Sequence, residues 1–190
     1  LFGMVTELYS TQDDKEFDKL FERIKKGEDI SDKMENEIGK YLGDIGTAHL
    51  SDETKQTIRL MMREIGEMES IGDSCFNLAR IMRRKRSNKV WFKDSLNDGI
   101  LKMYATVDEA LSQMNRVLGG HRADFTVETS FEIEHRINAL RDSLKDQNVA
   151  SLDNKEYSYE LGTVLSDLIA ECEKTGDYVM NVVEARLGLS

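Results

Sequence analysis

The sequence contains no proline, only two cysteines and a single tryptophan among its 190 residues. The dominance of Met, Leu, Ile, Glu, Lys and Asp over aromatic residues predicts an all-α protein. No apolar run approaches the roughly 18 residues that a membrane-spanning helix needs, and no secretory leader is visible. We expect Cys75 and Cys172 to be buried free thiols, which are typical of a reducing, cytoplasmic location.

The net charge of −10 and the pI of about 4.9 exclude nucleic acid as a general partner. Basic residues nevertheless gather in residues 80–93, which contain no acid, and Trp91 and Phe92 lie beside them. This stretch has two interpretations. It is either a solvated linker after the end of a helix, where cations are favourable, or a face directed at an anionic membrane surface.

Motifs typical of enzymes are scarce. The sequence has no glycine-rich phosphate loop, no nucleophile elbow and no zinc-type cysteine spacing. A ferritin-type di-iron site needs two Glu-x-x-His motifs, and this chain has one, at Glu132 and His135. The sequence therefore predicts a protein that is not an enzyme.

Apolar residues at helical spacing predict six helices, at residues 1–10, 14–46, 51–86, 94–118, 126–149 and 153–187. A kink or short break is expected at residues 27–31, and a capping box at Asp153 and Glu156 is expected to begin the last helix. The order of a short helix, a helix and a long helix occurs twice. We therefore predict two three-helix repeats, at residues 1–88 and 89–190.

Residues 67–77 and 171–181 are similar to each other and suggest an internal duplication. Identical residues occupy equivalent positions in the two stretches, at the pairs Glu67/Glu171, Glu69/Glu173, Gly72/Gly176, Asp73/Asp177 and Asn77/Asn181.

Each copy carries a stripe of oxygen-bearing side chains, because positions i, i+4 and i+8 share one face of a helix. The two candidate metal-binding stripes are Glu69, Asp73 and Asn77, and Glu173, Asp177 and Asn181. Their hard oxygen atoms suit magnesium, calcium, manganese or iron. The glycine before each aspartate costs a helix roughly 1 kcal/mol, and would let a backbone, ion or ligand come close.

Two weaker candidates and one alternative accompany these stripes. Glu28 with Asp32, and Glu134 with Asn138, form a similar pair of polar positions on the second and fifth predicted helices. The alternative is a buried polar seam without metal, in which these carboxylates pair with Arg or Lys of other helices.

The repeated Glu-x-x-Gly-Asp motif, on the third helix of each repeat, resembles the PhoU family. The segments 69–80 and 134–141 further resemble the PhoU-like domain of bacterial sodium/phosphate cotransporters. The resemblance implies a pseudo-symmetric six-helix bundle, with iron, zinc, manganese or magnesium held at Glu69/Asp73 and Glu173/Asp177. This chain has Ser70 and Lys174 where the family usually carries arginine.

The resemblance implies a regulatory domain that lies on the cytoplasmic side of the inner membrane and modulates phosphate transport. Its expected partner is the transmembrane portion of a phosphate transporter, in cis or in trans. The alternatives are a free-standing PhoU-type negative regulator and a metal-free helical adaptor. Because the first helix is far shorter than residues 94–118, we expect a fragment of a longer chain. Its exposed apolar face would be covered by a second copy, in a homodimer, or by preceding residues.

Overall fold

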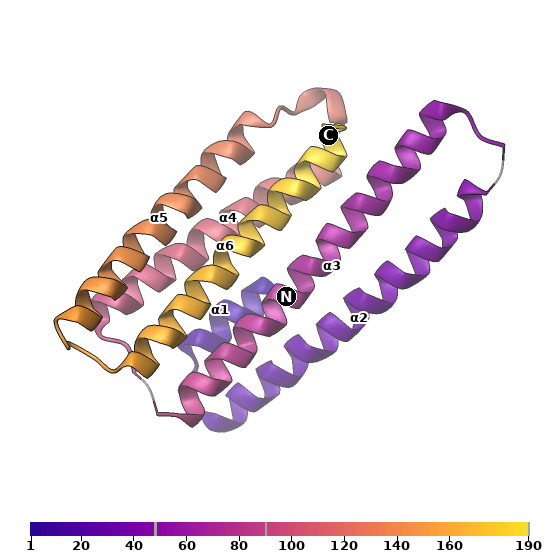
Figure 1. Cartoon of the computed structure of the whole chain (residues 1–190). Coiled ribbons are helices and arrows are strands. Elements are labelled where there is room, and N and C mark those ends of the chain that lie inside the picture. Colours follow the sequence, from indigo (N-terminus) through magenta and orange to yellow (C-terminus); the bar gives the residue numbers. More distant parts are fainter. Residues whose placement is uncertain (48, 90, 190) are drawn as a thin grey trace.

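The computed structural model describes residues 1–47, 49–89 and 91–189, and these residues form helices and no strands. Figure 1 shows long helices packed side by side and joined by short connections, with the short first helix among them. The elements are α1 (Phe2–Ser10), α2 (Asp14–Gly46), α3 (Asp52–Ser87), α4 (Asp94–Gly119), the 3₁₀ turn η1 (Arg122–Asp124), α5 (Glu128–Asp153) and α6 (Tyr159–Leu187). The predicted all-α six-helix bundle is confirmed.

The two repeats pack through their third helices. α6 lies at the centre of the bundle and contacts α3, α4 and α5, while α3 also packs on α2 and α1. Buried apolar side chains of all six α-helices form one continuous core. The predicted boundary between residues 88 and 89 falls in the connection from α3 to α4, and the division into two repeat domains stays a prediction.

Two local predictions were wrong. The start of the last helix is not at Asp153, because α5 continues to that residue. Ser158 caps α6 instead, and its hydroxyl accepts a hydrogen bond from the Leu161 N–H at 3.3 Å. The short break expected at residues 27–31 is also absent, since α2 is continuous. Gly27 is tolerated there because the Leu1 side chain fills the space that a Cβ would occupy.

The first helix is short, as predicted. α1 has 9 residues, whereas α4, its counterpart in the second repeat, has 26. Phe2, Val5 and Leu8 bury their side chains in the core. Beyond α1, large apolar side chains of α2 and α3 stay exposed, namely Met34, Ile38, Tyr41, Met61, Met62 and Met68. The expected uncovered face is therefore present, and its occupant stays a prediction.

Cys75 and Cys172 are both buried and free, as predicted. Burial raises the pKa of the Cys75 thiol to about 12 and raises the pKa of Cys172 as well, so both thiols stay protonated near neutral pH. Among the described residues, no helix combines the length and the apolarity needed to cross a membrane.

Candidate functional site

The two copies of the motif face each other across the contact between α3 and α6. The side-chain amide of Asn77 donates to Oε1 of Glu171 at 3.3 Å, and the amide of Asn181 donates to Oε2 of Glu67 at 3.0 Å. Both partners of each bond come from identical positions in the duplicated sequence. The two hydrogen bonds are therefore equivalent, and they show that α3 and α6 run antiparallel around a pseudo-twofold axis.

These bonds place the two asparagines apart from the acidic residues of their own stripes. Asn77 and Asn181 use their amide groups to join the repeats, whereas Asp73 and Asp177 are exposed on the outer sides of α3 and α6. The residues of each predicted stripe therefore have two different surroundings. The asparagines hold the centre of the bundle together, and the carboxylates contribute to two separate acidic clusters.

We define the first acidic cluster as Glu69 and Asp73 of α3 with Glu28, Asp32 and Glu35 of α2. Burial and the neighbouring Asp73 raise the pKa of Glu28. Burial, followed by the charges of Asp73, Glu35 and Asp32, raises the pKa of Glu69. Within the described residues, no lysine, arginine or histidine forms an ion pair with any of the five. These carboxylates repel one another without a compensating cation.

The second acidic cluster consists of Glu173 and Asp177 of α6 with Glu134, Asn138 and Arg141 of α5. A guanidinium nitrogen of Arg141 lies 2.6 Å from Oε1 of Glu173 and donates to Oδ1 of Asn138 at 2.8 Å. The amide of Asn138 in turn donates to Glu134. Burial and the charges of Glu173 and Glu134 raise the pKa of Asp177, and Arg141 opposes that shift.

The two clusters differ at two equivalent positions, one of which exchanges the sign of the charge. Glu28 corresponds to Glu134 and Asp32 to Asn138, and the same offset makes Glu35 the counterpart of Arg141. The first cluster thus has a carboxylate where the second has a guanidinium. As a result the first cluster carries uncompensated negative charge, while the second contains its own cation.

The two glycines explain how the clusters form. A Cβ on Gly72 would lie 3.0 Å from Oγ of Ser31, and a Cβ on Gly176 would lie 2.9 Å from Cδ1 of Ile137. Ser31 and Ile137 belong to α2 and α5, so each glycine lets a neighbouring helix come close beside the aspartate. That close approach brings Glu28 and Asp32 toward Asp73, and Glu134 toward Asp177. The glycines therefore serve the close packing of helices, and the approach of an ion or ligand beside them stays a prediction.

The chemistry of the first cluster fits a hard cation, because its donors are all carboxylate oxygens. Asp32 and Asp73 are exposed, and Glu28, Glu35 and Glu69 are half-buried, so their side chains have room to reorient. In this structure no three Asp, Glu, His or Cys side chains within residues 1–47, 49–89 and 91–189 converge to hold an ion. The second cluster suits a cation less well, because the carboxylate of Glu173 already forms an ion pair with Arg141.

Sequence reasoning found four of these carboxylates, and it found Glu28, Asp32, Glu134 and Asn138 as weaker candidates. It missed the contributions of Glu35 and Arg141. A signal for both was available, because the offset that relates Glu28 to Glu134 also relates Glu35 to Arg141. The alignment of the two repeats, continued one helical turn beyond Asp32 and Asn138, pairs Glu35 with Arg141.

Comparison with known proteins supports the architecture. No family model matches the sequence, and no curated protein matches it. Among solved structures, the chain is similar to the phosphate transport system regulatory protein PhoU from Streptococcus pneumoniae, with a TM-score of 0.63 and 16% sequence identity. The match covers 98% of this chain and 89% of that one. At this identity the comparison shows the fold, and the chain has a PhoU-like fold.

Proposed function

We propose that the chain is a regulatory domain of phosphate transport, and that its partner is the transmembrane portion of a sodium-dependent phosphate cotransporter. The similar Streptococcus protein is a phosphate transport system regulatory protein. In this proposal the domain acts on the cytoplasmic side of the inner membrane and has no catalytic role. The domain would respond to the binding of metal ions at the acidic clusters.

The observation that carries the metal part of the proposal is the uncompensated charge of the first cluster. Five carboxylates from α2 and α3 lie together, and the pKa values of Glu28 and Glu69 are raised. A divalent cation would relieve this repulsion and draw the two helices together. We propose that Glu69 and Asp73, with Glu28, Asp32 and Glu35 around them, hold iron, zinc, manganese or magnesium.

The metal-free alternative is favoured only at the second cluster. There Arg141 already supplies the positive charge that an ion would bring, as the polar-seam interpretation requires. We therefore propose that Glu173 and Asp177 bind a metal ion more weakly than Glu69 and Asp73 do. The two clusters would then respond to different metal concentrations, or only the first would respond.

Phosphate uptake by the intact protein in its host tests the regulatory role. Replacing Asp73 and Asp177 together with asparagine should change the sodium-dependent uptake rate several-fold, because the metal-responsive carboxylates are lost. Asp18→Asn with Asp146→Asn provides a matched control, since both residues are exposed and lie outside the clusters. Protein abundance is measured in parallel.

The sodium dependence separates the alternatives. A change confined to sodium-independent uptake would favour a free-standing PhoU-type regulator that acts on another transporter. Unchanged uptake in both components, at equal abundance, would refute the regulatory mechanism proposed for the clusters.

A further inference from the structure

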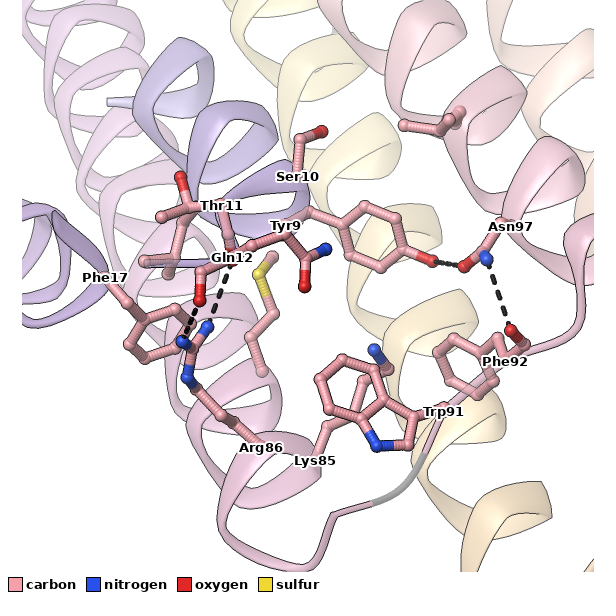
Figure 2. Close-up of a pocket in the computed structure, with 13 residues that line it drawn as sticks. Tyr9, Ser10, Thr11, Gln12, Phe17, Lys85, Arg86, Trp91, Phe92 and Asn97 are labelled. Carbon is pink, nitrogen blue, oxygen red and sulfur yellow. Dashed lines mark hydrogen bonds between the residues drawn. The ribbon is translucent and has the colours of Figure 1, made fainter. Parts of the chain in front are cut away.

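A cavity of about 240 Å³ lies at the end of the bundle opposite the α2–α3 turn, between the end of α1, the end of α3 and the start of α4. Figure 2 shows Lys85 and Trp91 on one side of it and Tyr9 with Asn97 on the other. The phenol of Tyr9 donates to Oδ1 of Asn97 at 2.6 Å, and the Asn97 amide donates to the Phe92 carbonyl at 3.3 Å. These bonds fix the wall of the cavity before any ligand arrives.

The charge in the cavity is opposite to that of the chain as a whole. The protein has a net charge of −10, yet the lining residues include Lys85 and Arg86 and no acid. The guanidinium of Arg86 is already engaged, because it pairs with Asp14 and donates to the Thr11 carbonyl at 3.0 Å. Within the described residues Lys85 forms no ion pair. One cation of the cavity is therefore available to an anion.

The surroundings of Lys85 are aromatic. Its ammonium nitrogen lies 4.9 Å from the ring centre of Phe92, 5.1 Å from that of Trp91 and 5.6 Å from that of Tyr9. Burial and the neighbouring charge of Arg86 lower the pKa of Lys85. The rings stabilise the cation in part, and an anion beside it would offset the remaining cost of burying the charge.

The exposed residues that line the cavity are of both kinds. Trp91 is 60% exposed and Leu101 is 40% exposed, and the polar residues Ser10 and Gln12 are exposed as well. A ligand whose charged group reached Lys85 would therefore place its remaining atoms against an indole ring and a leucine side chain. Inorganic phosphate would leave this apolar surface uncovered, whereas an anion with an aromatic or apolar body would bury it.

We propose that this cavity binds a small organic phosphate, with its phosphate group on Lys85 and its apolar or aromatic body against Trp91 and Leu101. Lysine binds phosphate as a compact point charge. The source of such a ligand is either a free phosphate monoester or the head group of an anionic lipid. This inference is independent of the acidic clusters and of the function proposed for them.

Part of the basic stretch is engaged in ion pairs within the bundle. Arg84 pairs with Asp167, Arg86 with Asp14, and Lys93 lies 3.8 Å from Glu156. These carboxylates pair with three of the seven basic residues at positions 80–93. The cation left without a carboxylate in the cavity is Lys85.

Intrinsic fluorescence tests the proposal directly, because Trp91 is the only tryptophan in the chain. Phenyl phosphate is titrated into the protein, and a saturable change in Trp91 emission is expected. Lys85→Met should raise the Kd about tenfold or more, since a hydrogen bond to a charged group is worth about 1.5–3 kcal/mol. Methionine keeps the length and the apolar stem of the lysine, so the variant should retain the fold.

The control is Lys89→Met, which removes the same charge from an exposed residue that does not line the cavity. It should change the Kd by less than about twofold, as surface charges of this kind are screened. Phenol, which has the body without the phosphate, should bind at least about tenfold more weakly than phenyl phosphate. Equal binding of phenol, or an equal Kd in the Lys85→Met variant, would overturn the proposal.

Vesicles of phosphatidylcholine with and without phosphatidic acid distinguish the two sources. A Lys85-dependent change in Trp91 emission with phosphatidic acid alone would identify a lipid head group, and a change with phenyl phosphate alone would identify a free phosphate. The absence of a saturable, Lys85-dependent change with either probe, up to about 10 mM phenyl phosphate, would refute the site.

Discussion

Replacing Glu35 with arginine is expected to remove most of the stabilisation of the protein by divalent ions. Arg141 occupies the equivalent position in the second cluster, where it pairs with Glu173. Glu35→Arg would bring the same arrangement to the first cluster, with a guanidinium beside Glu69 and Asp32. The repulsion that raises the pKa of Glu69 would be relieved without metal, and a cation would have to displace the arginine.

The expected effect is large. A ligand at a hundred times its Kd stabilises the folded state by about 2.7 kcal/mol, which corresponds to roughly 5–10 °C in Tm for a chain of this size. We expect a rise of this size in the wild-type protein when manganese or magnesium is added in excess, as measured by calorimetry. In the Glu35→Arg variant the rise should fall below about 2 °C, and the Tm without metal should exceed that of the wild type.

Glu37→Arg is the matched control. Glu37 lies on the same helix, is exposed and is outside the cluster, so this variant changes the net charge equally. It should keep the metal-dependent rise in Tm. Loss of the rise in both variants would indicate a diffuse effect of charge, and persistence of the rise in Glu35→Arg would remove Glu35 from the ion-binding cluster.

The second prediction is the converse change in the second cluster. Arg141→Gln is expected to destabilise the metal-free protein by about 1–3 kcal/mol, because Glu173 and Asp177 would lose a half-buried cationic partner. The same substitution should make this cluster resemble the first one. Divalent ions should then restore most of the lost stability, so the metal-dependent rise in Tm should be larger than in the wild type.

Arg136→Gln provides the comparison, since Arg136 is also on α5 and pairs with Glu109 at 2.6 Å, but on the exposed surface. Such a surface pair contributes about 0–1 kcal/mol, and its loss should leave the response to metal unchanged. Chemical denaturation with and without excess manganese measures both variants. If metal did not rescue Arg141→Gln, the guanidinium would be a structural partner of Glu173 and not a substitute for an ion.

The helices were predictable because the signals that define them are local. Apolar spacing fixed the number and the order of the elements, and Ser51 begins α3 as its N-cap. The two errors have different causes. Gly27 lies inside a continuous α2 and leaves room for the side chain of Leu1, the residue before α1, which the sequence pattern does not show. Asp153 is not a cap because α5 extends to it, and the ends of helices are the least certain part of a sequence-based prediction.

The acidic carboxylates were also predictable, because the duplication marks them twice. The partners of these side chains were not, since they depend on which face of each helix meets its neighbour. The direction of Asn77 toward Glu171 follows from the antiparallel packing of α3 on α6. The sequence pattern places Asn77 on the stripe of Asp73 but carries no information about that contact.

Metal content, measured by elemental mass spectrometry, tests the central claim most directly. The protein is purified without chelator or affinity metal, alongside the Asp73→Asn/Asp177→Asn double variant. The account predicts about one equivalent or more of iron, zinc, manganese or magnesium in the wild type, which the double variant loses because the charge that holds the ion is removed. No bound metal in either protein, even after incubation with excess ions, would contradict the account and make the acidic clusters polar helix faces.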